Sequence, residues 1–351
     1  MSVVDWKLAT KIAERAAGEG PAAMSGLDLE EIGGRAERAV LDYTGLGTRE
    51  PIPAPEWVTR REWTALNLRS MRELIEPVED RLTASLPAAG GDLARATAGK
   101  ILAAEIGLLL GVVSKRVLGQ YESPMTGATR PNRLVFVGEN IDEASAKLGS
   151  ERGDVLEWVA LHEGTHAVHF AAAPWLRRHL AGLTSELLAG VTLQSSPQEL
   201  LARARRAASA DPRRALAGLR GSDPVTLLAS EASRRTIAEV QATMAAVEGY
   251  AEHVMDAAAG DLGEVVPQLR AGIERRREIR SPIVRLLAWL LGLEMKLRQY
   301  RDGKRFADGV VELAGIEGLN GAWAGAESLP TLAELGRPHA WIARTQPATA
   351  V

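Results

Sequence analysis

The chain contains no cysteine among its 351 residues. This absence excludes disulfide bonds, a thiolate nucleophile and cysteine-ligated zinc, and with it a structural zinc finger. Any bound metal ion must therefore be held by histidine and carboxylate side chains. Histidine is itself scarce, with six residues in the chain, so histidines at a regular spacing carry information.

Long hydrophobic runs and an excess of one charge are also missing. The two most apolar runs, 106–113 and 286–293, are eight residues each, whereas a membrane-spanning helix needs roughly 20. We expect both to be buried helices. The 42 Lys and Arg residues nearly balance the 45 Asp and Glu residues, for a formal charge of -3. No global field therefore favours nucleic acid or an anionic membrane as a partner.

The first 20 residues carry charges throughout and lack the continuous apolar segment of a secretory signal. We therefore predict a cytoplasmic protein. With 46% hydrophobic residues, the chain can bury a sizeable core as one large domain or as two.

Residues 155–170, VLEWVALHEGTHAVHF, contain the pattern H-E-x-x-H. Residues four apart lie on one face of an α-helix, so His162 and His166 can present two imidazole nitrogens to one metal ion. Glu163 then points beside the metal and is the candidate general base. Apolar neighbours indicate that this helix is largely buried, where such polar groups are costly unless they bind something.

The alternative is a helix with satisfied core histidines and a surface glutamate. Chance would produce this pattern in roughly one such chain in a hundred. Its position within an apolar helical run, and the presence of downstream residues that can complete a site, favour the metal.

A second predicted helix, at 239–256, supplies the candidate third ligand, Glu248. A catalytic zinc site with two histidines needs one more protein ligand and an open position for water, and without cysteine that ligand must be His, Asp or Glu. Gly249 would allow a facing helix to come close. Glu252, four residues after Glu248, can hydrogen-bond a ligand imidazole from outside. The alternative for Glu248 is a solvated helix face.

Other polar residues are weaker candidates. His169 lies on the same stripe as the motif histidines, but its rise from His162 is about 10 Å, so we expect a wall of the cleft or an outer hydrogen-bond partner. We expect structural roles for His179, His253 and His339. Tyr250 and Tyr300 are candidate donors to an oxyanion, with ordinary packing as the alternative.

The periodicity of apolar residues predicts a mainly α fold with a small β element. Helices are predicted at 6–17, 29–43, 60–86 (divided at Pro77), 92–120, 155–170, 176–191, 239–256 and from Pro282 through Tyr300. An extended connector is predicted at 51–57.

The best strand is LVFVGEN, 134–140, just before the motif helix. By analogy with zinc peptidases that carry H-E-x-x-H, we expect it to be the edge strand along which an extended substrate lies. Asn140 and Asp142 are expected to cap the helix that follows.

We expect a helical part at 1–120, a catalytic part at 121–340 packed with it as one unit, and a C-terminal tail at 341–351. The arginine-rich segment 203–220 is the one candidate contact for nucleic acid. It lacks interleaved aromatic residues in a chain of negative net charge, so we disfavour that role.

His162-Glu163-x-x-His166 together with Glu248-Gly249-Tyr250-Ala251 resembles the gluzincin pattern, in which a glutamate on a later helix completes H-E-x-x-H. The interval of 82 residues between His166 and Glu248 is longer than in the aminopeptidases of that group. Their substrate preference therefore does not carry over.

From end to end the chain resembles an actinobacterial family of zinc-dependent metallopeptidases associated with deazaflavin coenzyme biosynthesis. The segments that carry this likeness are 5–9, 111–121, 161–170, 247–256 and 293–306. The resemblance implies a zincin-like fold and one Zn²⁺ ion.

These observations predict a metallopeptidase that cleaves peptide or amide bonds with zinc-activated water and Glu163 as general base. The alternative is a zincin-fold binding or assembly protein with a non-catalytic metal site. The sequence specifies neither the physiological substrate nor the oligomeric state.

Overall fold

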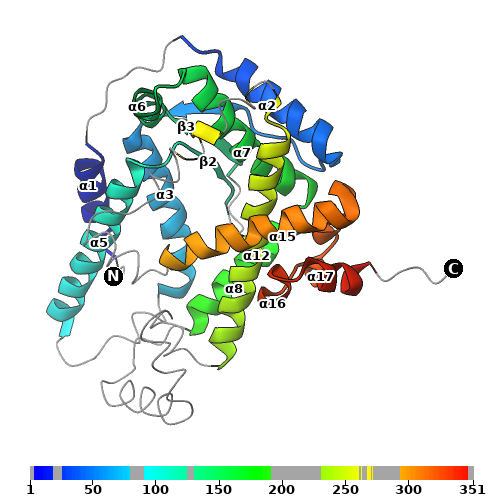
Figure 1. Cartoon of the computed structure of the whole chain (residues 1–351). Helices are drawn as coiled ribbons and strands as arrows, with labels where there is room; N and C mark the ends of the chain where they lie inside the picture. Colours follow the sequence, from blue (N-terminus) through cyan, green and yellow to red (C-terminus); the bar gives the residue numbers. More distant parts are fainter. Residues whose placement is uncertain are drawn as a thin grey trace.

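The computed structural model describes residues 4–18, 26–79, 91–124, 130–190, 231–260, 262, 267–269, 271 and 293–346, with the backbone alone described for 78, 91–95, 188–190, 231–232 and 293–301. Helices dominate these residues, and three short strands form one small sheet (Figure 1). The elements are α1 (Trp6–Ala17), α2 (Leu29–Thr44), β1 (Pro55–Val58), α3 (Arg60–Ile75), η1 (Glu76–Val78), α5 (Gly91–Ser114), β2 (Gly119–Glu122), β3 (Arg133–Val137), α6 (Gly138–Leu148), α7 (Arg152–Ala172), α8 (Trp175–Gly190), α12 (Glu231–Ala257), α15 (Leu293–Asn320), η3 (Gly321–Trp323), η4 (Ala326–Ser328), α16 (Leu332–Leu335) and α17 (Pro338–Thr345). The mainly α fold with a small β element is confirmed.

The early helices begin at the capping residues that their sequences provide. The Asp5 side chain accepts a hydrogen bond from the Leu8 N–H at the start of α1, and Thr59 and Glu62 form a capping box at the start of α3. The predicted division at Pro77 is confirmed, because α3 ends at Ile75 and Pro77 lies in the 3₁₀ turn η1.

Helix α5 ends at Ser114, earlier than the predicted residue 120, because the chain then enters the sheet as β2. The strand order is β1-β3-β2, with β1 parallel and β2 antiparallel to β3. The predicted strand at 134–140 is confirmed through Val137, but α6 begins at Gly138. The expectation that this strand lies at the edge was wrong, because β3 pairs on both sides and the edges of the sheet are β1 and β2.

The sheet separates two hydrophobic clusters, in keeping with the alternation of side chains along a strand. Leu134 and Phe136 of β3 join the larger cluster, which α2, α7, α12 and α15 also build. Val135 and Val137 face the smaller cluster with α1, α3 and α5. Because β1 and α2 pack on β3 and α7, the N-terminal third helps to support the motif helix. A division at residue 120 stays a prediction.

Helix α5 includes one stretch, Ala96–Ser114, that could cross a membrane by length and composition alone. It has 19 residues, a mean hydropathy of 1.7 and 33% of its residues buried. Its inner face supplies Ala103, Ile106 and Leu110 to the smaller cluster. The cytoplasmic location stays a prediction.

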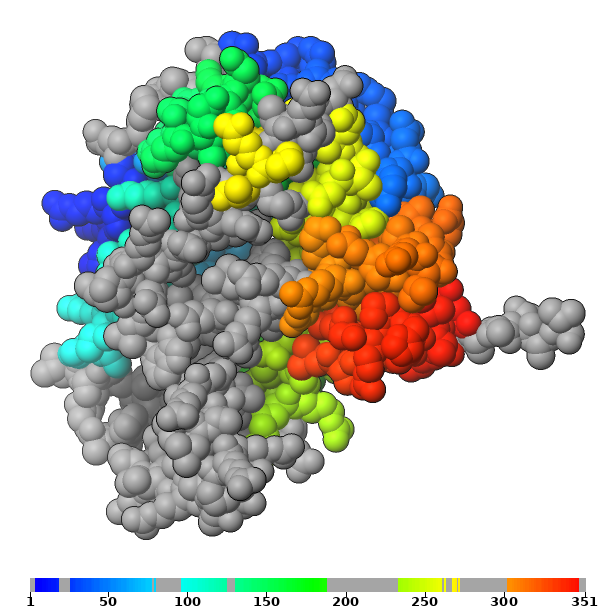
Figure 2. Space-filling model, in the orientation of Figure 1, coloured from blue at the N-terminus to red at the C-terminus, as the bar shows by residue number. Residues whose placement is uncertain are grey.

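The C-terminal helices close one side of the larger cluster. Helix α15 crosses α12 (Figure 1), and α2, α12, α15 and the terminal helices form a continuous surface in the space-filling view (Figure 2). Trp341 of α17 is fully buried, and its indole N–H donates to the Ser328 carbonyl over 2.7 Å. The predicted tail therefore begins later than residue 341. The segments 203–220 and 282–292 lie outside the described residues.

The capping role expected for Asn140 was wrong. Residue Val137 is the N-cap of α6, and Asn140 lies inside the helix with no exposed surface. Its amide donates to the Ser114 carbonyl over 2.6 Å and to that of Val117, and its carbonyl accepts from Arg60 Nε over 2.8 Å. Asn140 thus connects the end of α5 to α6 and α3.

We expect Asn140→Ala to lower the free energy of unfolding by about 2 kcal/mol, because buried hydrogen-bonding groups lose their partner. Urea denaturation would measure this change, with exposed Lys147→Ala as the control that stays near wild type. An equal effect of the two substitutions would contradict this role.

Asp142, the other expected cap, instead pairs with Arg152 over 2.6 Å.

Candidate metal centre

Helix α7 carries the H-E-x-x-H motif through the middle of the molecule (Figure 1). It packs against α2, α12 and the sheet, and most of its residues are buried. The helical spacing places His162 and His166 side by side, with ring centroids 4.8 Å apart and an interplanar angle of 86°. The prediction that these imidazoles share one face is confirmed.

Helix α12 brings Glu248 to the two histidines. Its carboxylate oxygen Oε2 lies 3.7 Å from His162 Nε2 and 3.6 Å from His166 Nε2. The three side chains each offer one ligand atom, and these atoms all lie within 4.8 Å of one another. The fold thus assembles the three predicted ligands from two helices that are far apart in sequence.

The chemistry and spacing of these donors fit a zinc ion. Two imidazoles and one carboxylate are a usual donor set of catalytic zinc. The separations of 3.6 and 3.7 Å exceed normal hydrogen-bond lengths. They approach the spacing of about 3.3 Å that tetrahedral ligands with bonds of about 2.0 Å would have.

Burial and neighbouring charges shift the pKa values of the two histidines in opposite directions. Burial lowers the pKa of His162, and the neighbouring His166 lowers it further. Burial also acts to lower the pKa of His166, but the nearby negative carboxylate of Glu248, with the charges of Glu163 and Glu252, outweighs it and raises that pKa. Three carboxylates around two imidazoles form a negative environment that suits a divalent cation.

Glu163 is held by the edge strand β2. Its Oε2 atom accepts a hydrogen bond from the Tyr121 backbone N–H over 2.9 Å. The Leu118 carbonyl points to β3 and accepts a hydrogen bond from the Val137 N–H. Successive residues of an antiparallel strand direct their backbone groups alternately to its two edges. The Tyr121 N–H, three residues further on, therefore points away from β3 and toward Glu163 of α7. Sequence reasoning missed β2, because four residues without a clear polar and apolar alternation give little signal. Gly119 is its one distinctive residue.

The backbones of α12 and α15 touch next to Glu248. A Cβ atom added to Gly249 would lie 2.1 Å from the Gly303 carbonyl carbon, and one added to Gly303 would lie 2.0 Å from the Ala245 oxygen. The prediction that Gly249 admits a facing helix is confirmed. This crossing fixes the position of α12 one residue from Glu248.

Tyr250 does not line the metal centre in the manner we expected. Its side chain is 1% exposed, and its hydroxyl donates to Asn320 Oδ1 over 2.7 Å. Burial raises the pKa of this hydroxyl. A hydroxyl bonded in this way links α12 to the end of α15 and is not directed at an oxyanion. Tyr300 lies in α15, but its side chain is outside the described part, so its role stays a prediction.

His169 is fully buried between aromatic rings. Its ring centroid lies 3.8 Å from that of Trp323 and 5.2 Å from that of Tyr250. Burial holds the pKa of His169 well below its ordinary value, with a smaller effect from His166, so the imidazole is neutral. His169 is not among the converging ligands. We expected His169 and Glu252 to hydrogen-bond the groups that hold the metal ion, and for both residues this role stays a prediction.

Two of the remaining histidines bridge helices, as a structural role would require. His253 Nε2 lies 2.7 Å from the Tyr43 hydroxyl and its Nδ1 lies 2.8 Å from Asp308 Oδ1, which links α12 to α2 and α15. His179 of α8 lies 3.6 Å from Glu239 of α12.

Comparison with known proteins agrees with this geometry. Residues 4–342 match the model of the zincin-like metallopeptidase family, so the chain belongs to this family. Among solved structures, it is similar to a "putative hydrolase with a novel fold" from Chloroflexus aurantiacus. The identity is 27% and the TM-score 0.68, over 97% of this chain and 98% of the other. No curated protein matches the chain. The zincin-like fold is thus confirmed, whereas the actinobacterial and deazaflavin associations stay predictions.

We expect Gly303→Ala to weaken zinc affinity roughly tenfold to a hundredfold, the range typical of changes around a metal ligand. The added methyl group must push α15 away from α12 and move Glu248. A competition titration with a chromophoric chelator would measure the affinity. The matched control is Gly182→Ala in α8, where an added Cβ meets nothing within 4 Å. Unchanged affinity in Gly303→Ala would show that the crossing does not position the ligand.

Proposed function

We propose that this protein is a zinc-dependent hydrolase that cleaves peptide or other amide bonds. His162, His166 and Glu248 would hold one Zn²⁺ ion, and Glu163 would act as general base. The observation that carries this proposal is the convergence of the three ligand atoms within 4.8 Å, with Glu163 adjacent to the first ligand in the chain. Membership of the zincin-like metallopeptidase family supports the same reaction class.

The zinc ion, when bound, would lower the pKa of a water molecule to about 7 and polarise the carbonyl of the substrate. Glu163 would accept the proton of the attacking water at its carboxylate and deliver it to the leaving amine. The Tyr121 N–H orients that carboxylate by donating to Oε2. Burial of the two imidazoles and of Glu248, whose side chains are 12–14% exposed, reduces competing solvation of the ligands.

The neighbouring strand supports an extended peptide as substrate. Within the described residues β2 pairs with β3 alone, so the groups of its other edge, apart from the Tyr121 N–H that Glu163 occupies, can form main-chain hydrogen bonds with a second extended chain. That edge lies beside Glu163, because the Tyr121 amide contacts the carboxylate. An extended peptide along β2 would therefore pass close to the general base. A non-peptide amide substrate has no extended main chain that could pair with this edge.

We expect Glu163→Gln to abolish turnover while zinc content stays near one ion per chain. Glutamine keeps the size of the side chain but cannot accept the proton. Hydrolysis of a diverse peptide library, with metal analysis of the same preparation, would test this. Retained hydrolysis would exclude Glu163 as the base. Wild-type protein that holds zinc but shows no chelator-sensitive cleavage would favour the alternative of a binding or assembly protein.

We expect Glu248→Ala to reduce zinc retention strongly after dialysis, because the site loses its one anionic ligand. Elemental analysis would measure this loss. The matched control is Glu239→Ala, which removes a carboxylate of the same helix that is about half exposed and pairs with His179. Equal zinc content in Glu248→Ala and wild type would contradict the assignment of the third ligand.

A further inference from the structure

Gly119 of β2 lies directly against the candidate general base. A Cβ atom added at Gly119 would be 2.9 Å from Glu163 Cγ, 2.9 Å from Val159 Cγ1 and 3.2 Å from Phe136 Cδ1. Carbon atoms at these separations overlap, because the optimal distance between them is about 3.5–4.0 Å. The missing side chain at this position is therefore what lets the strand approach the motif helix.

The same strand contacts Glu163 a second time through Tyr121. In an antiparallel pair the backbone groups of residues two apart point to the same edge of the strand, and at the outer edge the N–H of Tyr121 donates to Glu163 Oε2 over 2.9 Å. Gly119 thus admits the aliphatic stem of Glu163, and Tyr121 holds its carboxylate oxygen. A hydrogen bond to an ionised carboxylate is stronger than one between neutral groups, so this contact fixes the side-chain conformation.

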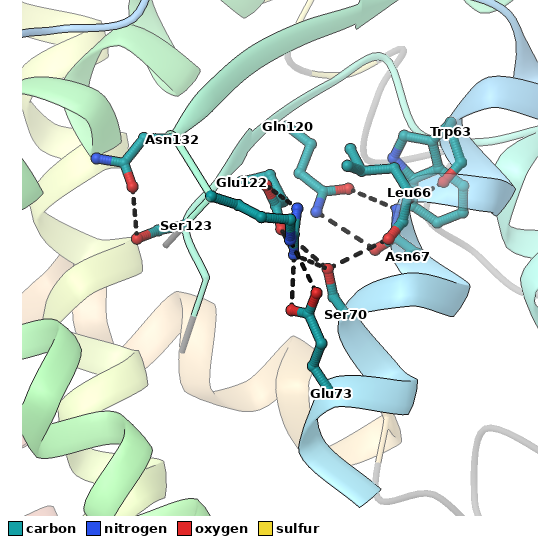
Figure 3. A network of polar contacts seen from close by, with 10 residues as sticks. Trp63, Leu66, Asn67, Ser70, Glu73, Gln120, Glu122, Ser123 and Asn132 are labelled. Carbon is teal, nitrogen blue, oxygen red and sulfur yellow. Dashed lines mark hydrogen bonds and ion pairs between the residues drawn. The ribbon is translucent and has the colours of Figure 1, made fainter. Parts of the chain in front are cut away.

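The opposite face of β2 is attached to α3. Gln120 and Asn67 exchange two amide hydrogen bonds, of 3.2 and 3.3 Å (Figure 3). This pair lies between the contacts that Gly119 and Tyr121 make on the other face. It limits rotation of the strand away from α7.

The end of β2 is held by a buried ion cluster. Glu122 is 4% exposed and accepts hydrogen bonds from Arg130 over 3.0 Å and from Ser70 of α3 over 2.9 Å. Arg130 also pairs with Glu73 of α3 over 2.8 Å. Figure 3 shows Glu122, Ser70 and Glu73 directed toward one another between the strand and the helix. The strand therefore has little freedom to retreat from a bulkier residue at 119.

We propose that Gly119 is a positioning residue for Glu163, an inference that rests on the proposed function of Glu163 as general base. An alanine methyl group at 119 must displace one of three neighbours. Phe136 is fully buried, and the β-branched Val159 is restricted to one preferred rotamer in its helix. Glu163 is the most adjustable of the three, so its carboxylate moves and loses the Tyr121 N–H.

The test compares Gly119→Ala with wild type in two measurements. We expect kcat on a peptide substrate to fall roughly tenfold to a hundredfold, as a misplacement of about 1 Å can produce, while KM and zinc content stay unchanged. We also expect hydrogen exchange at the Tyr121 amide to accelerate, because Glu163 is its acceptor. Exchange does not depend on catalysis. Wild-type kcat or wild-type exchange at Tyr121 would overturn the proposal.

Two further variants separate positioning from general destabilisation. Gly153→Ala, in the same helix as Glu163, adds a methyl group that meets nothing within 4 Å and should leave kcat unchanged. In the double variant Gly119→Ala/Val159→Ala, removal of the valine methyl groups makes room for the new one. Partial recovery of kcat and of Tyr121 protection from exchange supports the proposal. The double variant can be compared with wild type even when Gly119→Ala alone folds poorly. No recovery, with a folded protein, overturns it.

The outcome also distinguishes this inference from the proposed function. Absence of chelator-sensitive hydrolysis by the zinc-loaded wild type would contradict the hydrolase, whereas the exchange measurement would still decide whether Gly119 and Tyr121 hold Glu163. Wild-type hydrolysis with an unaltered Gly119→Ala variant would contradict the positioning role alone.

Discussion

Two imidazoles and a carboxylate meet in a part of the molecule that water scarcely reaches, and the surrounding structure has to hold them together. Buried polar groups are costly unless they are paired or bind a metal ion. The opposite shifts in the pKa of His162 and His166 reflect this competition between desolvation and the nearby carboxylates. A bound divalent cation would resolve the competition, because it would take both imidazoles in their neutral form and compensate the charge of Glu248.

The elements around α7 can be understood from this requirement. Helix α12 must lie close enough to deliver Glu248, and its glycine contact with α15 fixes that approach. The C-terminal segment then supports α12 through Asn320, which accepts from Tyr250 and donates to the Thr44 carbonyl of α2. On the other side, β2 contacts Glu163 and is attached to α3. The N-terminal third thus helps to position Glu163 of the motif helix, and the C-terminal third helps to position Glu248 of α12.

The family assignment and the geometry agree at the level of reaction class. A zincin-like metallopeptidase requires a helix with two histidines and an acid, a third ligand and access for an extended substrate. The described residues bring such a helix together with the carboxylate of Glu248, and β2 is an edge strand beside Glu163. The long interval between His166 and Glu248 departs from the aminopeptidase branch of the gluzincin pattern. The substrate preference of those aminopeptidases therefore does not carry over to this chain.

Local spacing determined part of this centre before any fold was known. The relation of His162, Glu163 and His166 follows from the helical repeat, and glycine after Glu248 indicated a close helix crossing. Tertiary structure alone decided that Glu248 reaches the histidines and that β3 is central in the sheet. It also decided that the hydroxyl of Tyr250 turns to Asn320. Periodicity encodes which residues share one face of an element, whereas the pairing of distant elements depends on packing and on hydrogen bonds between residues far apart in sequence.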